Sequence, residues 1–490
     1  MNRQILLVEP NYKNKYPPMG LMKLSTYYKR LGDHVTFFKG NLIDLVLDDT
    51  FEMLKEQLYA NDSTIFWEQY KPQICQYIKK GTRSSLSEVP KVDENPIIEA
   101  LFKFYRQYFY RKRYFEPEFR KYDRVGVTTL FTFYWDITIE TINFAKQLCK
   151  TDDGVMVGGI MASILADRVE AETGITPYIG TLHTPDELDP GNGMIIDALP
   201  LDYSILEEID YQYPASDAYF AYMTRGCVNK CKFCAVPKLE PVYTEFLPVS
   251  EQVHLAEQRY GAKRDLLLLD NNVLASCRFN DIVDDIIAAG FGRNATYASP
   301  NLYEIAVQNL RSGHNDRGYI KSCVRQFRLL LDKVGRNQVQ SVYDLLRDNY
   351  LLEDYTATKK AILDTYEKLR PYFETVYSQK PKQRHVDFNQ GIDARLITDA
   401  NMEKLAEIPI RPVRIAFDHW ELHEVYEKAV RTAVRHGHTN LSNYILYNYE
   451  DQPIELYLRL KLNVDLCEKL GASIYSFPMK YHPKRPLPRF

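Results

Sequence analysis

The chain has 490 residues, about three times the ~150 residues of a typical domain, so the sequence predicts two or three domains rather than one. Hydrophobic residues make up 45% of the chain and charged residues 26%, proportions that exclude a disordered, collagenous or disulfide-stapled protein. The formal net charge of -3 excludes an attraction to nucleic acid or anionic lipid based on overall charge and leaves only local patches for such a role.

Neither the N-terminus nor the apolar runs indicate export or insertion into a membrane. The first apolar run, 5–8, is not followed by a small-residue cleavage site, and no stretch approaches the ~18 apolar residues of a membrane span. The eight cysteines are too sparse for a disulfide framework, but three of them cluster, which in a reducing compartment indicates a metal site. We therefore expect a cytoplasmic protein without a membrane association.

The first part of the chain, 1–203, alternates predicted strands with predicted helices. An apolar strand, a turn at Pro17-Pro18, a helix and a second strand open this pattern, which resumes after a long interruption at about 42–122. The interruption is too long for a plain loop, so we expect an insertion that is helical in part. The alternation predicts a parallel α/β sheet covered on both faces. The strands are expected at 5–8, 35–38, 124–129 and 155–157.

The second part, 204–490, contains six steps of the strand-then-helix type. A segment at about 291–384 interrupts it, and the apolar residues of this segment keep helical spacing, so we expect a helical insertion. The whole chain is therefore expected to be α/β, with two domains and two insertions. The six strands are expected at 218–224, 266–269, 385–389, 413–417, 444–447 and 473–477.

Cys227, Cys231 and Cys234 form a C-x-x-x-C-x-x-C motif directly after the first of these strands. Three thiolates on one short loop can hold three irons of a [4Fe-4S] cluster and leave the fourth iron open to a ligand. A structural zinc site normally needs four nitrogen or sulfur ligands, and the loop contains no histidine or fourth cysteine. Chance clustering of buried thiols is the other alternative. The number of ligands favours the iron–sulfur cluster.

This cysteine triplet, with Phe233 before the third cysteine, resembles the signature of the radical S-adenosylmethionine (SAM) superfamily. The resemblance implies that SAM chelates the open iron and that one electron from the reduced cluster cleaves the sulfonium. The products would be methionine and a 5′-deoxyadenosyl radical that abstracts hydrogen from a substrate. The resemblance also implies a partial (β/α)6 TIM-type barrel, which matches the six steps of 204–490, and an external electron donor such as flavodoxin or ferredoxin.

Polar residues at the ends of later strands are candidate contacts to SAM or substrate, because loops converge at the carboxyl ends of parallel barrel strands. Asp270 and Asn271 follow the second strand, where the superfamily commonly contacts the SAM amino group. Gln390, Asp393 and Arg395 follow the third, where Arg395 would pair with the SAM carboxylate and Asp393 with a hydroxyl. Helix capping or surface solvation is the alternative for each residue. Asp418 and His419 follow the fourth strand. Near the sixth strand, core packing is the favoured role of Tyr475, Met479 and Tyr481, and lining a substrate pocket is the alternative.

The first domain resembles the cobalamin-binding Rossmann-type domain found ahead of many radical SAM cores. The resemblance rests on Tyr16-Pro17-Pro18-Met19-Gly20-Leu21, Gly32-Asp33-His34-Val35 and Val157-Gly158-Gly159. The lower-ligand motif D-x-H-x-x-G is absent, because Asp33 and His34 are adjacent, so no histidine ligand is carried over. Glycines at a strand end either cradle a cofactor or permit close packing of strand and helix. Cobalamin therefore stays open as a cofactor.

The stretch from Lys103 to Arg124 contains eight basic and three acidic residues, interleaved with aromatic residues. Basic and aromatic side chains together suit nucleic acid, because cations meet phosphates and rings stack on bases. A helix docked on its own domain with solvated charges gives the same pattern. Nucleic acid is thus one candidate for the unknown substrate or partner. The C-terminal stretch adds Lys480, Lys484, Arg485 and Arg489.

The sequence thus predicts a radical SAM enzyme with one cluster and an unidentified substrate. The alternative within the enzymes is a cobalamin-dependent radical SAM methyltransferase. The alternative outside them is a non-catalytic iron–sulfur or zinc protein that binds nucleic acid. A second cluster is not expected, because the other five cysteines are scattered along the chain: Cys75, Cys149, Cys277, Cys323 and Cys467.

Overall fold

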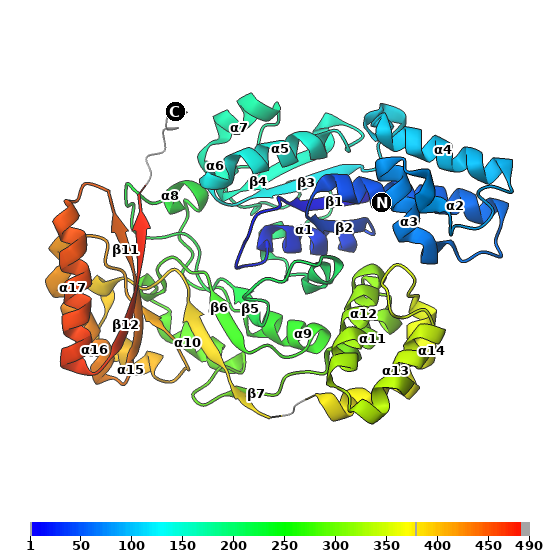
Figure 1. Ribbon diagram of the computed structural model, residues 1–490. Coiled ribbons are helices and arrows are strands. Elements are labelled where there is room, and N and C mark those ends of the chain that lie inside the picture. Colours follow the sequence, from blue (N-terminus) through cyan, green and yellow to red (C-terminus); the bar gives the residue numbers. More distant parts are fainter. Residues whose placement is uncertain (1, 378–379, 482–490) are drawn as a thin grey trace. The chain divides into compact units, whose positions relative to one another are not determined.

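The computed structural model describes residues 2–377 and 380–481 and divides the chain into two compact units (Figure 1). The first unit is Met1–Pro214 with Asn301–Tyr377, and the second is Ala215–Pro300 with Ser378–Phe490. Both units contain parallel strands and many helices, so the predicted α/β class is confirmed. Among the described residues, no helix combines the length and apolarity needed to cross a membrane. The basic residues Lys484, Arg485 and Arg489 lie outside the described residues.

The first unit is built on a four-stranded parallel sheet. Its first strand is buried along its whole apolar run, with 0% exposure at Ile5 through Val8, because helices cover both faces of the sheet. In Figure 1, the first helix lies on one side of the sheet and the helices after the third and fourth strands lie on the other. In sheet order the strands are β2 (His34–Lys39), β1 (Gln4–Glu9), β3 (Arg124–Thr129) and β4 (Val155–Gly159). The covering helices are α1 (Met19–Arg30), α5 (Trp135–Lys146), α6 (Ile160–Ile164) and α7 (Ala166–Thr173).

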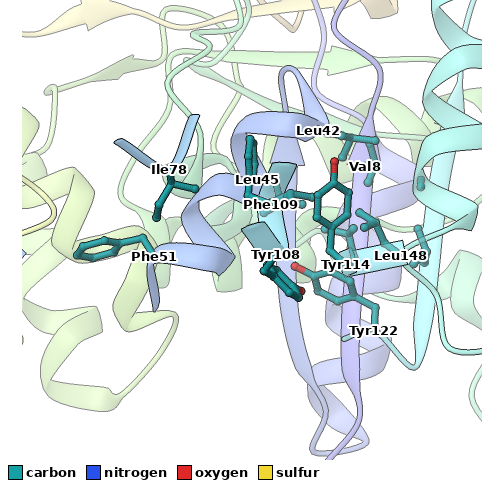
Figure 2. Close-up of a cluster of buried hydrophobic side chains, with 14 of the residues drawn as sticks. Val8, Leu42, Leu45, Phe51, Ile78, Tyr108, Phe109, Tyr114, Tyr122 and Leu148 are labelled. Carbon is teal, nitrogen blue, oxygen red and sulfur yellow. The ribbon is translucent and has the colours of Figure 1, made fainter. Parts of the chain in front are cut away.

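The insertion at 42–122 is helical, as expected, and extends the hydrophobic core of the first unit. Figure 2 shows Tyr114 and Tyr122 beside Leu148 and Val8 of the sheet layer. Most rings of the 103–124 stretch are therefore core residues, whereas the rings of Phe104 and Tyr110 are exposed. The helices of this insertion are α2 (Leu42–Asn61), α3 (Lys71–Lys80) and α4 (Pro96–Tyr110).

The second insertion is also helical, and its helices pack against the first unit. The Asn315 side chain donates to the Ser204 carbonyl at 2.9 Å, and the Arg325 guanidinium pairs with Glu207. The segment thus interrupts 204–490 in chain order and belongs to the first unit, in which its apolar faces form a hydrophobic core of their own. Its helices are α11 (Leu302–Ser312), α12 (Asp316–Lys333), α13 (Arg336–Asp348) and α14 (Lys359–Val376).

The second unit contains six strands that run in parallel, in two sheets of three. Isolated parallel bridges, Val386 to Ile410 and Ile392 to Ile415, link the two sheets. Within the described residues no pairing joins the last strand to the first, so the array is open and a closed barrel is not formed. The strands are β5 (Ala218–Ala221), β6 (Asp265–Leu268), β9 (His385–Phe388), β10 (Val413–Arg414), β11 (Asn440–Tyr447) and β12 (Ser473–Lys480).

Helices follow these strands, and all of them except the short helix 236–239 share a core with the strands. Val386 and Phe388 of β9 point into this core, and Asp387 between them points to the opposite face, where it forms a buried two-bond pair with Arg414 of β10. The helices are α8 (Val236–Leu239), α9 (Ser250–Tyr260), α10 (Phe279–Ala288), α15 (Asp399–Leu405), α16 (His423–Arg435) and α17 (Pro453–Leu470). A short antiparallel pair, β7 (Thr296–Tyr297) and β8 (Lys382–Gln383), completes the unit.

Candidate functional site

The three motif cysteines lie on the loop that follows β5, and each is half-buried. Two of the sulfurs accept backbone hydrogen bonds, from the Asn229 amide to Cys227 Sγ and from the Val236 amide to Cys234 Sγ, both at 3.4 Å. Burial raises the pKa of the Cys231 thiol, and Cys234, Asp418 and Cys227 raise it further. Backbone amides are therefore already directed at two of the three sulfurs of this loop.

The base of the cysteine loop is closed by backbone contacts. Arg225 and Thr244 exchange two backbone hydrogen bonds, of 3.2 and 2.9 Å. Between Arg225 and the first cysteine, Gly226 adopts φ +68°, and a Cβ there would lie 2.5 Å from the Val242 carbonyl oxygen. Only glycine fits this position without displacing the chain. The loop thus leaves and rejoins the fold at a fixed point.

Glu240 binds both the loop and the end of the next strand, and the sequence analysis missed it. One carboxylate oxygen accepts from Arg225 Nη1 at 2.6 Å. The other accepts from the Gly226 amide at 2.8 Å and from Asn271 Nδ2 at 3.1 Å. No motif in the sequence marks this residue, because its role depends on a turn of the chain rather than on spacing. Asn271, expected at the SAM amino group, is held by this carboxylate.

Asp270 is 1% exposed and anchors the segment that leads into the cysteine loop. Its Oδ1 accepts from the Met223 amide at 2.9 Å, from the Thr224 hydroxyl at 2.7 Å and from the Thr224 amide. Burial raises the pKa of Asp270 to about 6, although these hydrogen bonds oppose the shift. Asp270 Oδ2 and both amide atoms of buried Asn272 have no hydrogen-bond partner among the described residues. Buried polar atoms of this kind require a water or a ligand group.

The turn after β9 is joined to the cysteine loop through Asp393. This carboxylate accepts two side-chain bonds from Arg395, at 2.8 and 2.6 Å, and one from Asn229 Nδ2 at 3.1 Å. Burial alone would raise the pKa of Asp393, but its bonds to Arg395 lower it. Gln390 is exposed and makes no hydrogen bond to another described residue. Of the three residues predicted here, Asp393 therefore meets the cysteine loop at Asn229, a residue that no motif singles out, and Arg395 is held by Asp393.

Phe233, the aromatic residue of the motif, lies against two rings from other loops. Its ring centroid is 5.9 Å from that of His419 and 5.4 Å from that of Tyr449. Arg459 on α17 fixes both of these loops, because its Nη1 donates to the carbonyls of Asp418 and Leu446, each at 2.6 Å. Arg459 is completely buried, and its burial is accommodated by these carbonyls and Asp451.

The candidates on β12 differ in their surroundings. Tyr475 is 64% and Met479 is 43% exposed, so neither is a core residue. Tyr481 places its ring 4.8 Å from that of Tyr449, the residue that contacts Phe233. Tyr481, the residue after β12, thus contributes one ring to the neighbourhood of the motif, whereas Tyr475 and Met479 of β12 leave their side chains open.

The donor set of the loop consists of three thiols. Among residues 2–377 and 380–481, no group of three or more histidine, cysteine, aspartate or glutamate side chains is spaced to hold a single metal ion. In a [4Fe-4S] cluster each cysteine binds a different iron, so the ligands need not converge on one point. Of the other cysteines in the second unit, Cys277 contacts Glu245 and Cys467 lies on α17. The chemistry of the loop fits a cluster with three protein ligands.

Comparisons with known proteins give limited information. No protein-family model matches the chain. No curated protein matches it either. One similar solved structure is the radical SAM methyltransferase TsrM from Kitasatospora setae, with a tryptophan substrate and the SAM analogue aza-SAM bound. The identity is 13%, the alignment covers 97% of this chain and 73% of TsrM, and the TM-score is 0.43. A likeness at this level does not identify a function.

Proposed function

We propose that the chain is a radical SAM enzyme whose cluster is held by Cys227, Cys231 and Cys234. The observation that carries the proposal is that three half-buried cysteine thiols share one loop at the carboxyl end of a parallel strand. Loops at this end of parallel arrays are where ligands and catalytic groups meet. When bound, a reduced [4Fe-4S] cluster with SAM on its open iron supplies the electron that cleaves the sulfonium.

The residues around the loop have distinct proposed roles. The Arg395 guanidinium would exchange Asp393 for the SAM carboxylate as its hydrogen-bond partner. Both partners are planar carboxylates that can accept its two parallel bonds. The unpaired Oδ2 of Asp270 and the amide of Asn272 are acceptors and donors available for polar groups of SAM or for water. Phe233 would keep the loop packed against His419 and Tyr449.

The substrate and the electron donor are further parts of the proposal. Reduction of the cluster calls for an external carrier such as flavodoxin or ferredoxin. The open array between β5 and β12 leaves Tyr475 and Met479 exposed as candidate substrate contacts. The 103–124 stretch offers exposed Arg111 and Lys112 to a nucleic acid, but few exposed rings.

The experiment is anaerobic reconstitution with iron and sulfide, followed by dithionite and SAM. We expect iron binding that is lost in Cys231→Ala and kept in Cys467→Ala, a matched change on α17. The wild-type chain should form 5′-deoxyadenosine. S-adenosylhomocysteine without 5′-deoxyadenosine would instead favour methyl transfer. A reconstituted chain that forms neither product, or iron binding unaffected by Cys231→Ala, would contradict the proposal.

A further inference from the structure

The carboxyl edge of the first sheet has the topology at which α/β proteins bind cofactors. In the order β2-β1-β3-β4, β2 lies on one side of β1 and β3 lies on the other side. The loops after β1 and β3 therefore separate at a switch point, and the crevice between such loops is the common ligand site of open parallel sheets. A cofactor of the first unit would be expected there.

This crevice is bridged by two stacked tyrosines. Tyr12 comes from the loop after β1 and Tyr134 from the segment after β3, and their ring centroids are 4.7 Å apart with planes inclined by 6°. Tyr12 is only 5% exposed. The Tyr134 hydroxyl donates to the Lys13 carbonyl at 3.3 Å, which fastens the second ring to the first loop.

A buried ion pair lies directly beside the stacked rings. Lys39, the last residue of β2, pairs with Glu9, the last residue of β1, at 3.2 Å, and their side chains are 1% and 0% exposed. Lys39 Nζ lies 4.8 Å from the Tyr12 ring centroid and 4.5 Å from that of Tyr211. It also donates to the Tyr12 carbonyl at 2.8 Å. The charged side chains at the ends of both strands are therefore already paired within the chain.

The loop after β1 is held in this position by hydrogen bonds from a distant segment. The Asn14 amide donates to the Tyr211 hydroxyl at 2.8 Å, and that hydroxyl donates to the Asn14 carbonyl at 2.6 Å. Asn14 Nδ2 donates to Glu9 at 3.1 Å, and the Tyr213 hydroxyl donates to the same carboxylate. These bonds join the loop after β1 to the end of β1 and to residues 211–213.

Of the two glycines at the end of β4, Gly159 is explained without a cofactor. Gly159 adopts φ +106°, and a Cβ there would lie 2.2 Å from the Thr129 carbonyl oxygen on β3. The close approach of the neighbouring strand therefore requires this glycine. A Cβ on Gly158 would meet nothing nearer than Tyr178, at 3.9 Å.

We propose that the switch-point crevice of the first unit is filled by the chain's own Tyr12–Tyr134 pair, so that this crevice binds neither a corrinoid nor a nucleotide cofactor and the unit is a scaffold. A planar cofactor would have to displace the stacked rings and the Lys39–Glu9 pair together. The residues present do not fit cobalamin at this edge, and the cobalamin-dependent alternative loses its support. This inference does not depend on the cluster or on SAM.

The test combines chemical modification with ligand retention on the full chain. Tetranitromethane nitrates accessible tyrosines, and we expect Tyr12 to react about tenfold or more slowly than Tyr110, a tyrosine with an exposed ring. After incubation with aquocobalamin and desalting, we expect no measurable retention of the corrin absorbance, with FMN and NAD as nucleotide probes giving the same result. Nitration of Tyr12 at the rate of Tyr110 would overturn the proposal. So would stoichiometric retention of any of these probes by the wild-type chain, if the Tyr12→Trp variant no longer retains that probe.

Discussion

Arg459 donates a hydrogen bond of 2.6 Å to the backbone carbonyl of Asp418, the residue before one of the two rings that contact Phe233. Because Arg459 is fully buried and also pairs with Asp451, Arg459→Met should leave a buried carboxylate and several carbonyls unpaired. We expect a loss of about 3–5 kcal/mol in the stability of the second unit. Chemical denaturation, with hydrogen exchange at 417–420 and 446–451, measures it.

The control for this change is Arg431→Met on α16. Arg431 is exposed and pairs with Glu427 one helical turn away, so the loss should stay below ~0.5 kcal/mol. Equal effects of the two substitutions would show that the buried guanidinium does not hold the loops.

Glu240→Ala should loosen the cysteine loop before any cluster is bound. The substitution removes the acceptor shared by Gly226 and Asn271, and charge-assisted bonds of this kind contribute about 1.5–3 kcal/mol each. We expect faster alkylation of Cys227 in the metal-free chain and less iron per chain after reconstitution. Glu240→Gln should fall between wild type and Glu240→Ala, whereas Glu251→Ala on α9 should match wild type.

Asp270 predicts a specific pH dependence of stability. Its pKa of about 6 lies above the usual value of 3.8, so the folded chain binds more protons than the unfolded chain between these two values. Stability should therefore fall as pH rises from about 4 to 6, by up to roughly 3 kcal/mol, and stay lower at neutral pH. Asp270→Asn keeps one oxygen acceptor and removes the charge. The unfolding midpoint of Asp270→Asn, relative to that of wild type, should rise between pH 4.5 and pH 7.5. A difference between the two midpoints that stays constant with pH would refute this account.

Tyr12→Phe should leave the first unit intact or raise its stability. The Tyr12 hydroxyl is buried and has no hydrogen-bond partner in the part of the chain that the structure describes, and a buried unsatisfied group of this kind costs about 1–3 kcal/mol. Phenylalanine keeps the ring that stacks on Tyr134. Tyr12→Ala should instead lower the unfolding midpoint, because it removes the stacked ring and opens a cavity. Thermal denaturation of the two variants against wild type separates these effects.

Arg395→Lys should weaken SAM binding to the reconstituted chain. Lysine cannot form the two parallel bonds that a guanidinium makes with a carboxylate, so we expect a loss of about tenfold in affinity. Arg435→Lys on α16, whose guanidinium is exposed and pairs with Asp399, should bind SAM as wild type does. Isothermal titration measures both, and equal affinities would place Arg395 outside the SAM site.

The sequence predicts the elements of this fold well because each depends on local patterning. The apolar run of β1 and the helical spacing of the second insertion are visible in a few consecutive residues. The spacing of an apolar helix face shows that the face is buried but not which core covers it. For that reason, the packing of α12 against Ser204 and Glu207 could not be predicted from the sequence.

The same limit applies to the candidate site. The three cysteines are recognisable because all of them lie within eight positions of the chain. Glu240, Asn229 and Arg459 act on residues that are distant in sequence or through the backbone, and neither leaves a spacing pattern. Asp393 and Arg395 were accessible to prediction because they follow a strand, and their pairing with each other became visible only in the structure.

The return of the chain to the first unit at Asn301–Tyr377 has a consequence for synthesis on the ribosome. A nascent chain that has reached Pro300 already contains β5, the cysteine loop and β6. It still lacks Asn315 and Arg325, which bond to residues 204–209 of the first unit. The N-terminal part therefore cannot finish folding before the cysteine loop has emerged. Translation and assembly of the two units must overlap in time, and an expression fragment that stops at Pro214 would expose the surface that α12 covers.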